Sequence, residues 1–239
     1  MAFLFFNLSG DMAMWRNPYE SMGSFSSLGP APSNIAGLLG AALGFPSPRS
    51  LAAGQQDSKK LKDQMKKGLP WPVSPELLKW EHDNDYHVAC RWTGGTPYRM
   101  PWNVNGVKEI SKGDNLRLQQ QVIEKPSYDV LVKLNREEAD RSATALKNPA
   151  FPLFLGASFC RAIVKNIDIM ENIPDGGNWA MHKQYVFGEA TPFTRHVINA
   201  EETFERVVSD GYWVYPEPSN PGEILEDPLV KGYCFFEKK

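Results

Sequence analysis

Cysteine and histidine are scarce in this sequence. Its three cysteines, Cys90, Cys160 and Cys234, lie far apart and form no CxxC pair. This spacing provides neither the ligands of a zinc knuckle nor a disulfide framework, and an odd number of cysteines is typical of a reducing cytoplasm. Four histidines leave few candidates for acid–base chemistry. We therefore expect a cytoplasmic protein that holds no metal and no other cofactor.

Long apolar runs are also absent. The longest, residues 35–45, is far too short for a membrane span, which needs about 20 residues. Residues 1–6 are apolar but include no basic residue, so they do not fit the pattern of a secretory signal. We expect no membrane partner.

An excess of positive charge is missing too. The formal net charge is −2 and the isoelectric point is about 6.1, which argues against a wholly basic nucleic-acid coat protein. The charge is unevenly spread, however. Residues 91–133 carry seven Lys/Arg against four Asp/Glu, and residues 136–239 carry eleven against sixteen. A basic middle before an acidic end fits a protein with one face on RNA and another on protein, although solvated surface charge gives the same pattern.

Hydrophobic periodicity and turn residues predict an α+β fold. The expected order of strand, helix, strand, strand, helix, strand is that of the ferredoxin-like (RRM-like) βαββαβ core. The predicted elements are a strand at 2–8, a helix at 33–43, a strand at 86–92, a hairpin of strands 116–123 and 128–134, a helix at 136–147 and a strand at 162–169.

The same pattern predicts two parts of the chain. Residues 1–170 are expected to form the ferredoxin-like domain, with insertions at about 45–80 and 94–116. The first insertion is rich in proline, lysine and serine, with a short amphipathic helix at 57–67. Residues 171–239 are rich in proline and glycine with short β-prone pieces, and we expect a small β-rich C-terminal region there.

The predicted helix at 33–43 is unusual in its small residues. Ser33 is expected to cap its N-terminus and Gly44 to end it. Gly37, Gly40, Ala41 and Gly44 share one face by their spacing. Such a face allows close approach to a neighbouring backbone, so we expect Gly40→Leu to disrupt folding or assembly.

Aromatic and basic residues alternate through the middle of the chain. Single-stranded RNA is bound by this combination, because cations contact phosphates and flat side chains stack on bases. The alternative is that Trp92 and Trp102 pack in the core while the cations face water. The candidate RNA-binding residues of this segment are Arg91, Trp92, Tyr98, Arg99, Trp102, Lys108, Lys112 and Arg117.

A second candidate site lies at the start of the predicted helix. Free backbone N–H groups at Ser33 and Asn34, together with the helix dipole, favour a phosphate. Arg16 and Tyr19, in the preceding loop, are candidates to join this site. An ordinary helix cap is the alternative.

Catalytic groups are sparse. Metal-free RNA cleavage needs a general base, a general acid and a cation, and the one compact set is His182, Lys183 and Tyr185. Carboxylates stand close to histidines around residues 82–87 but fit no specific metal template. The sequence therefore favours RNA binding over RNA cleavage.

Three stretches together resemble the CRISPR-associated Cas5 family of the RAMP superfamily. They are residues 10–16 (GDMAMWR), residues 30–44 with the glycine-rich helix, and residues 146–156 (LKNPAFPLFLG). The last is similar to the family's Asn-Pro…Pro-Leu-aromatic-Leu-Gly signature. The three occur in the family's order, and the resemblance covers about residues 1–170.

The resemblance implies a non-catalytic subunit of a type I Cascade complex. Such a subunit holds the 5′ handle of the crRNA, contacts the backbone and large subunits, and lies close to target DNA at the PAM. A thumb, expected here near residues 94–116, wedges at a kink in the RNA. One branch of the family cleaves precursor crRNA without metal, so an endoribonuclease is the alternative. A protein-only scaffold with the same core also stays open.

Overall fold

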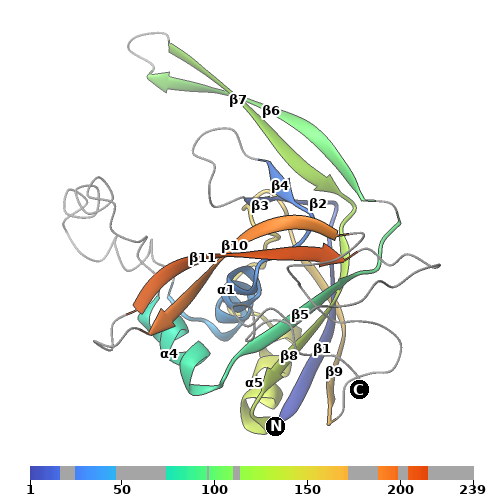
Figure 1. Ribbon diagram of the computed structural model, residues 1–239, viewed down its shortest axis with the longest axis vertical. Coiled ribbons are helices and arrows are strands. Elements are labelled where there is room, and N and C mark those ends of the chain that lie inside the picture. The colour runs from blue at the N-terminus through green and yellow to red at the C-terminus, as the bar shows by residue number, and fades with distance from the viewer. Residues whose placement is uncertain are drawn as a thin grey trace.

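The computed structural model describes residues 1–16, 25–46, 74–95, 97–109, 114–171, 188–198 and 204–214. Its centre is an antiparallel sheet of four strands in the order β5-β8-β1-β9 (Figure 1). The strands are β1 (Ala2–Ser9), β5 (His87–Trp92), β8 (Ser127–Leu134) and β9 (Ile163–Met170). Numbered along the chain, these four strands lie in the order second, third, first, fourth.

Strand β1 lies inside this sheet and is buried by alternation. Leu4, Phe6 and Leu8 are fully buried in the main core, whereas Phe3 and Phe5 point to the other face. Successive side chains of a strand point to opposite faces, so the apolar residues at even positions fix which face packs inward. The sequence prediction of a buried first strand is confirmed.

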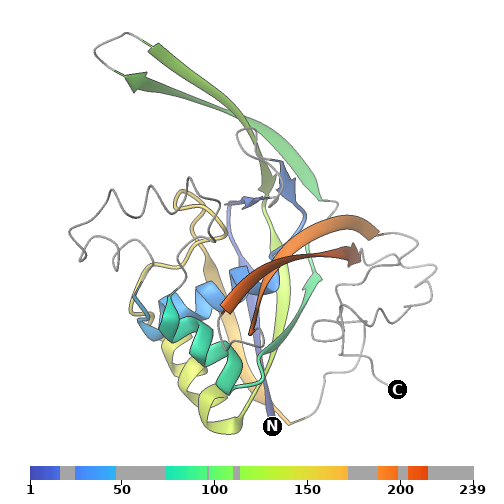
Figure 2. The same cartoon turned by 60° about the vertical axis from the view of Figure 1, so that its left-hand side comes forward.

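Two helices cover the buried face of the sheet, and a third lies beside them (Figure 2). They are α1 (Pro32–Leu43), α5 (Arg136–Lys147) and α4 (Pro75–Asp83). No helix within the described ranges is long and apolar enough to cross a membrane. The helix α4 was not predicted, although Ser74 followed by Pro75 is a typical start signal, and the Ser74 hydroxyl accepts from the N–H of Leu77 at 3.4 Å.

The predicted helix ends are confirmed with one correction. Asn135 caps α5 by accepting from the N–H of Glu138 at 2.8 Å, and Gly44 ends α1 with φ at +85°. Ser33, however, is not the N-cap of α1, because the helix begins one residue earlier at Pro32 and Ala31 takes the cap position. Proline starts the first turn readily because it has no N–H to satisfy.

A long two-stranded ribbon, here called the thumb, extends away from the central sheet (Figure 1). It consists of β6 (Tyr98–Glu109) and β7 (Asp114–Glu124), which pair along their length. The expected hairpin between 116–123 and 128–134 is therefore wrong. Strand β7 pairs with β6 and with β2 (Met12–Ala13), whereas β8 pairs with β1 and β5.

The chain changes sheets at Lys125. This residue adopts a positive φ of 45°, and its N–H donates to the carbonyl of Asp11 at 2.8 Å. The turn directs β8 into the central sheet instead of back along β7. Two strands adjacent in sequence can thus belong to different sheets when a turn is anchored to a third segment.

The remaining described strands are short or C-terminal. Trp15–Arg16 (β3) pairs with Ser26–Ser27 (β4), and β10 (Gly188–Ile198) pairs with β11 (Phe204–Val214) in a hairpin that contacts α1. The predicted helix at 57–67 lies outside the described residues. The domain boundary near residue 170 stays a prediction.

The three sequence stretches that resemble the Cas5 family meet at one junction. The N–H of Met14 donates to the carbonyl of Leu155 at 3.0 Å. The N–H groups of Ala150 and Phe151 donate to the carbonyl oxygens at the end of α1, those of Ala42 and Ala41, at 3.0 and 3.2 Å. Backbone hydrogen bonds thus join the loop after α5 both to the segment after β1 and to α1.

Glycine is required where these segments touch. A Cβ atom on Gly156 would lie 2.0 Å from the carbonyl oxygen of Met14, and Gly156 has φ of +85°. A Cβ atom on Gly10 would lie 2.6 Å from the carbonyl oxygen of Arg161. Only glycine permits both approaches.

The small-residue face of α1 is only partly used as expected. A Cβ atom on Gly40 would lie 3.1 Å from a methyl group of Leu77 on α4, so this position is tightly packed. Gly37 is different, since a Cβ atom there would have no heavy atom within 4 Å among its described neighbours. The close backbone approach occurs at the C-terminal end of α1, around Gly44.

We expect Gly156→Ala to destabilise the protein strongly. A left-handed backbone costs about 1–2 kcal/mol in alanine and overpacking adds about 1–3 kcal/mol, so the free energy of unfolding should fall by about 3 kcal/mol. The matched control is Gly37→Ala, which should be neutral or stabilise by up to about 1 kcal/mol through helix propensity. Urea denaturation measures both. Equal effects of the two substitutions would contradict the packing at Gly156.

Candidate nucleic-acid interface

The thumb joins the body beside the short β3–β4 pair. On the thumb, the Arg99 guanidinium donates through Nε to the carbonyl of Ser26 at 2.9 Å. Ser26 is the register partner of Arg16, so both arginines lie at the base of the thumb. The side chain of Arg16 is exposed and has no hydrogen bond or ion pair with any other described residue. Its guanidinium can therefore pair with an external anion without first leaving a described partner.

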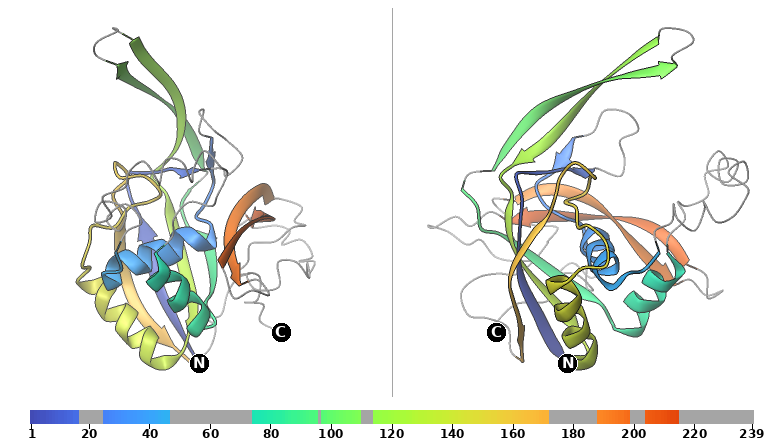
Figure 3. Two further views of the ribbon diagram at one scale, coloured as in Figure 1. Left: turned by 90° about the vertical axis from the view of Figure 1, so that its left-hand side faces the viewer. Right: turned by 180° about the vertical axis from the view of Figure 1, so that it is seen from behind.

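Exposed aromatic rings also occur on the thumb and on a loop of the body. Tyr98 and Trp102, on the first thumb strand, are 57% and 36% exposed. Trp102 stacks on Phe159, which is 46% exposed, with ring centroids 6.2 Å apart and planes at 15°. Phe159 belongs to the gold loop between α5 and β9 in Figure 3. Large exposed rings of this kind mark interaction surfaces.

The loop that carries Phe159 is itself ordered as a tight hairpin. The N–H of Leu155 donates to the carbonyl of Cys160 at 2.7 Å, and Phe154 forms an antiparallel bridge with Arg161. Directly opposed residues point to the same side, so an exposed ring and an exposed guanidinium lie together. Arg161 has no hydrogen-bond or ion-pair partner for its side chain within the described ranges.

These residues define what we call the thumb-base surface. They share exposure, and the two cations among them have no partner in the described part of the chain, while the rings present faces that a planar group can cover. The members are Arg16, Tyr98, Trp102, Phe154, Phe159 and Arg161.

Trp92, by contrast, does not belong to the thumb-base surface, because its side chain is only 4% exposed. Its Nε1 donates to the carbonyl of Gly95 at 2.6 Å, and its ring packs edge-on against Tyr128 at 5.2 Å. The expectation that Trp92 stacks on RNA is thus corrected. Its ring is enclosed by the core and offers no face to a base.

Tyr128 is the hub of that aromatic cluster. Its hydroxyl donates to the carbonyl of Leu28 at 2.5 Å and accepts from Nε1 of Trp15 at 3.0 Å. Burial raises the pKa of Tyr128 above its usual range, so the phenol is neutral. The group therefore connects the segment after β4 to the sheet and has no exposed route to a substrate.

Arg91 is also committed to the fold. Its guanidinium pairs with Asp129 at 2.5 Å, and the other oxygen of Asp129 accepts from Asn7 at 2.5 Å. Asn166 in turn donates to Asn7 at 2.5 Å. These side chains come from all four strands of the central sheet and form a continuous polar row across it. Arg91 neutralises a carboxylate that is largely buried, so it is not free for phosphate.

The start of α1 offers fewer donors than expected. The N–H groups of Asn34 and Ile35 both donate to the carbonyl of Ala31, and the side chain of Asn34 accepts from the N–H of Ala31 at 2.8 Å. Pro32 has no N–H. In the described part of this turn, Ser33 alone keeps a backbone donor without an acceptor, which weakens the predicted phosphate site.

The other candidate residues are only partly described. Arg117 and Lys108 lie on the thumb strands, where the backbone alone is described. Lys112 and Tyr19 lie outside the described residues, as does the set of His182, Lys183 and Tyr185.

The family of the chain is shown by its sequence. The model for the family described as CRISPR-associated protein (Cas_Cas5) matches residues 3–208. The chain belongs to the Cas5 family. No curated protein matches the Cas5 chain.

Solved structures show distant likenesses to this Cas5 chain. A chain of a "CRISPR RNA-guided surveillance complex" has 12% identity and a TM-score of 0.47, with 92% of this chain and 95% of that one covered. A crystal structure of a Cas protein has 16% identity and a TM-score of 0.40, with 88% and 94% covered. A chain of the Type III-B Cmr-beta complex bound to cognate target RNA and AMPPnP has 10% identity and a TM-score of 0.44, with 89% and 84% covered.

Sequence reasoning missed half of the thumb-base surface. Phe154, Phe159 and Arg161 follow the signature loop, where no periodic pattern separates exposed from buried rings. The available signal was the density of aromatic residues between Phe151 and Cys160, in a segment too irregular for a strand or helix. Only the docking of the loop shows which rings stay outside.

Acidic and histidine side chains form no metal site in the described ranges, where no group of three or more suitable ligands comes together. His82 lies 3.3 Å from the carboxylate of Asp83, and His87 contacts the backbone carbonyl of Asp85 at 2.7 Å. These are local pairs.

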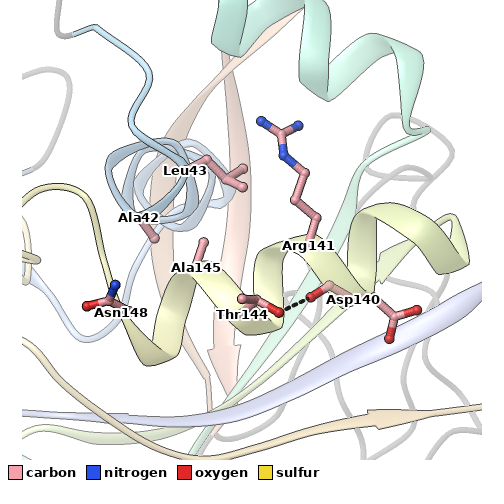
Figure 4. A pocket seen from close by; sticks show the side chains of 7 residues that line it. All are labelled: Ala42, Leu43, Asp140, Arg141, Thr144, Ala145 and Asn148. Carbon is pink, nitrogen blue, oxygen red and sulfur yellow. Dashed lines mark hydrogen bonds between the residues drawn. The ribbon is translucent and has the colours of Figure 1, made fainter.

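A pocket of about 460 Å³ opens between α1 and α5 (Figure 4). Its charged side chains are already paired, since Arg141 contacts Glu138 at 3.3 Å and Asp140 contacts Arg136 at 3.2 Å. Its lining also includes apolar residues such as Ala42, Leu43 and Ala145. The pocket lies between the helices, whereas the thumb rises from the opposite end of the sheet (Figure 1), so it does not belong to the thumb-base surface.

Two arginine substitutions should separate folding from binding. Arg91→Ala leaves Asp129 with one fewer donor, so it should lower the free energy of unfolding by about 2 kcal/mol. Arg16→Ala removes an exposed cation and should change stability by less than about 0.5 kcal/mol while weakening RNA binding. Urea denaturation and RNA titration of both variants measure these effects. The reverse pattern would contradict the assignment of Arg91 to the fold.

Proposed function

We propose that this Cas5 protein is a non-catalytic, guide-RNA-binding subunit of a type I CRISPR Cascade complex. The observation that carries the proposal is the thumb-base surface, where Trp102 of the thumb stacks on Phe159 and the exposed Arg161 lies opposite the exposed Phe154. The exposed Arg16, on the β3–β4 pair to which the thumb is bonded, adds a second cation whose side chain has no partner among the described residues. Cations neutralise phosphates and rings stack on unpaired bases, which is the chemistry that single-stranded RNA requires.

Charge pairing supports RNA at this surface. Elsewhere on the described surface, most exposed cations face a carboxylate, as Lys79 does with Asp83 and Arg136 with Asp140. An isolated cation has no such partner to leave when it binds phosphate. The chain needs no overall positive charge, because affinity depends on the few cations that reach the backbone.

The proposed site within the complex follows from the family. We infer that the chain has a ferredoxin-like core, which the strand order β5-β8-β1-β9 with helices on one face supports. It holds the 5′ handle of the crRNA and contacts the backbone and large subunits, close to target DNA at the PAM. Beyond the loop that carries Arg161, residues 171–239 hold twelve acidic and six basic residues, a balance that suits protein contacts better than RNA.

The test is binding and cleavage of labelled repeat RNA by the purified chain, without metal and then with magnesium. We expect a gel shift that weakens with salt and no cleavage product. Absence of binding both by the chain alone and by the chain assembled with its partner subunits would overturn the proposal. A discrete cut without metal would support the precursor-processing endoribonuclease, and loss of that cut in His182→Ala would assign its active site.

A charge substitution sharpens the RNA test. Arg161→Gln should weaken binding at low salt and reduce the slope of log affinity against log salt by about 0.7, the value for one phosphate contact on a single strand. The matched control is Lys79→Gln, which removes an exposed cation that already pairs with Asp83. A salt slope unchanged by Arg161→Gln would exclude Arg161 from the interface.

A further inference from the structure

The stack of Trp102 on Phe159 joins two parts of the molecule that are far apart in sequence. Trp102 belongs to the thumb, and Phe159 to the hairpin loop of the body. The other aromatic pairs described are edge-on or tilted and involve at least one core ring. This pair is different because both rings are more than one third exposed and lie nearly parallel.

The stack lies farther out along the thumb than its other attachments. Among the described residues, strand β7 pairs with the body at Glu124 and Ile123 alone. Arg99 bonds to Ser26 at the same level of the thumb, since Arg99 is the register partner of Ile123. Trp102 comes three residues after Arg99. Among the described side chains, Trp102 makes the outermost contact of the thumb with the body. Because this contact lies farthest from the base of the thumb, it opposes bending of the thumb relative to the body most effectively.

The face of the thumb that carries Trp102 continues the core. Met100 and Val122 are register partners that pack in the main core. Trp102 and its partner Gln120 lie two residues farther along each strand and therefore on the same face. The amide oxygen of Gln120 is shielded from solvent and has no hydrogen-bond partner among the described residues. The Trp102 contact thus extends the core outward, with one unsatisfied acceptor beside it.

The loop beneath Phe159 is a firm support. Cys160 and Leu155 bond across it at 2.7 Å, and Cys160 also donates to the carbonyl of Ala157 at 2.9 Å. Gly156 packs against the backbone of Met14. A ring mounted on this loop has little freedom to follow the thumb, so the stack fixes the thumb to the body.

We propose that Phe159 is a positioning residue that sets the direction of the thumb through Trp102. The inference rests on the proposed RNA-binding function in one respect. Thumb and body must contact the same RNA strand, so the spacing between Trp102 and the body cations Arg16 and Arg161 has to be set before binding. Fixing that spacing in the free protein removes an ordering cost from the RNA-bound state.

Hydrogen exchange of the RNA-free protein tests the contact by itself. An aromatic pair contributes about 0.5–1.5 kcal/mol, so Phe159→Ala should speed exchange of amides in residues 98–124 by about 2- to 10-fold. Trp102→Ala should do the same, and the double variant should add little, because both remove one contact. Phe159→Tyr keeps the ring and should restore slow exchange. The control is Phe151→Ala, which removes a ring that is 47% exposed and has no ring partner among the described residues.

Gln120→Met tests a change that should preserve or strengthen the contact between Trp102 and Phe159. It replaces the unsatisfied amide by an apolar chain of similar length, which should leave the stack intact or tighten it. Exchange in residues 98–124 should then be unchanged or slower. Faster exchange in Gln120→Met, or unchanged exchange in Phe159→Ala, would overturn the positioning role.

RNA titration then connects the contact to function. Phe159→Ala should lower RNA affinity by about 2- to 10-fold, Phe159→Tyr should restore it, and Phe151→Ala should match the wild type. If wild-type protein binds no RNA but the exchange results hold, the proposed function fails and the thumb contact stands. If Phe159→Ala speeds exchange without changing affinity, the contact is structural only and its positioning role is refuted.

Discussion

The structure depends on one close backbone approach, between Gly156 and the carbonyl of Met14. A side chain at Gly156 would occupy the same space as that carbonyl oxygen. The approach allows the hydrogen bond from Met14 to Leu155, and with it the loop after α5 docks on the segment after β1. That loop carries Phe154, Phe159 and Arg161, so half of the thumb-base surface owes its position to a glycine.

Residues of the same type have structural roles at some positions and surface roles at others, and their contacts with neighbouring side chains decide which role each takes. Arg91 is held by Asp129 within a polar row across the sheet, whereas the side chains of Arg16 and Arg161 have no partner in the described chain. Trp92 packs on Tyr128 inside the core, whereas Trp102 meets Phe159 at the surface. A chain with a net charge of −2 can still present a surface suited to RNA, because binding depends on the few cations that reach the phosphates and not on the net charge.

The sequence predicted those elements whose signals are local. The alternation in residues 2–8 predicted β1, Asn135 predicted the start of α5, and Gly44 predicted the end of α1. The predicted hairpin around Lys125 failed because the partner of a strand is not a local property. Strand β7 pairs with β6 and β2, and the bond from Lys125 to Asp11 redirects the chain into another sheet. Helix α4 was missed because its signal, Ser74 before Pro75, lies in a stretch dominated by lysine, proline and serine.

The sequence by itself determined the family, the start of α5 at Asn135 and the end of α1 at Gly44, and the central segment from which Tyr98 and Trp102 come. Tertiary structure alone decided which aromatic rings are exposed and which cations are paired. The physical reason is that burial and ion pairing depend on neighbours far away in sequence. Trp102 and Phe159 are 57 residues apart, and Arg91 and Asp129 are 38 residues apart. No local sequence pattern predicts either of these two contacts.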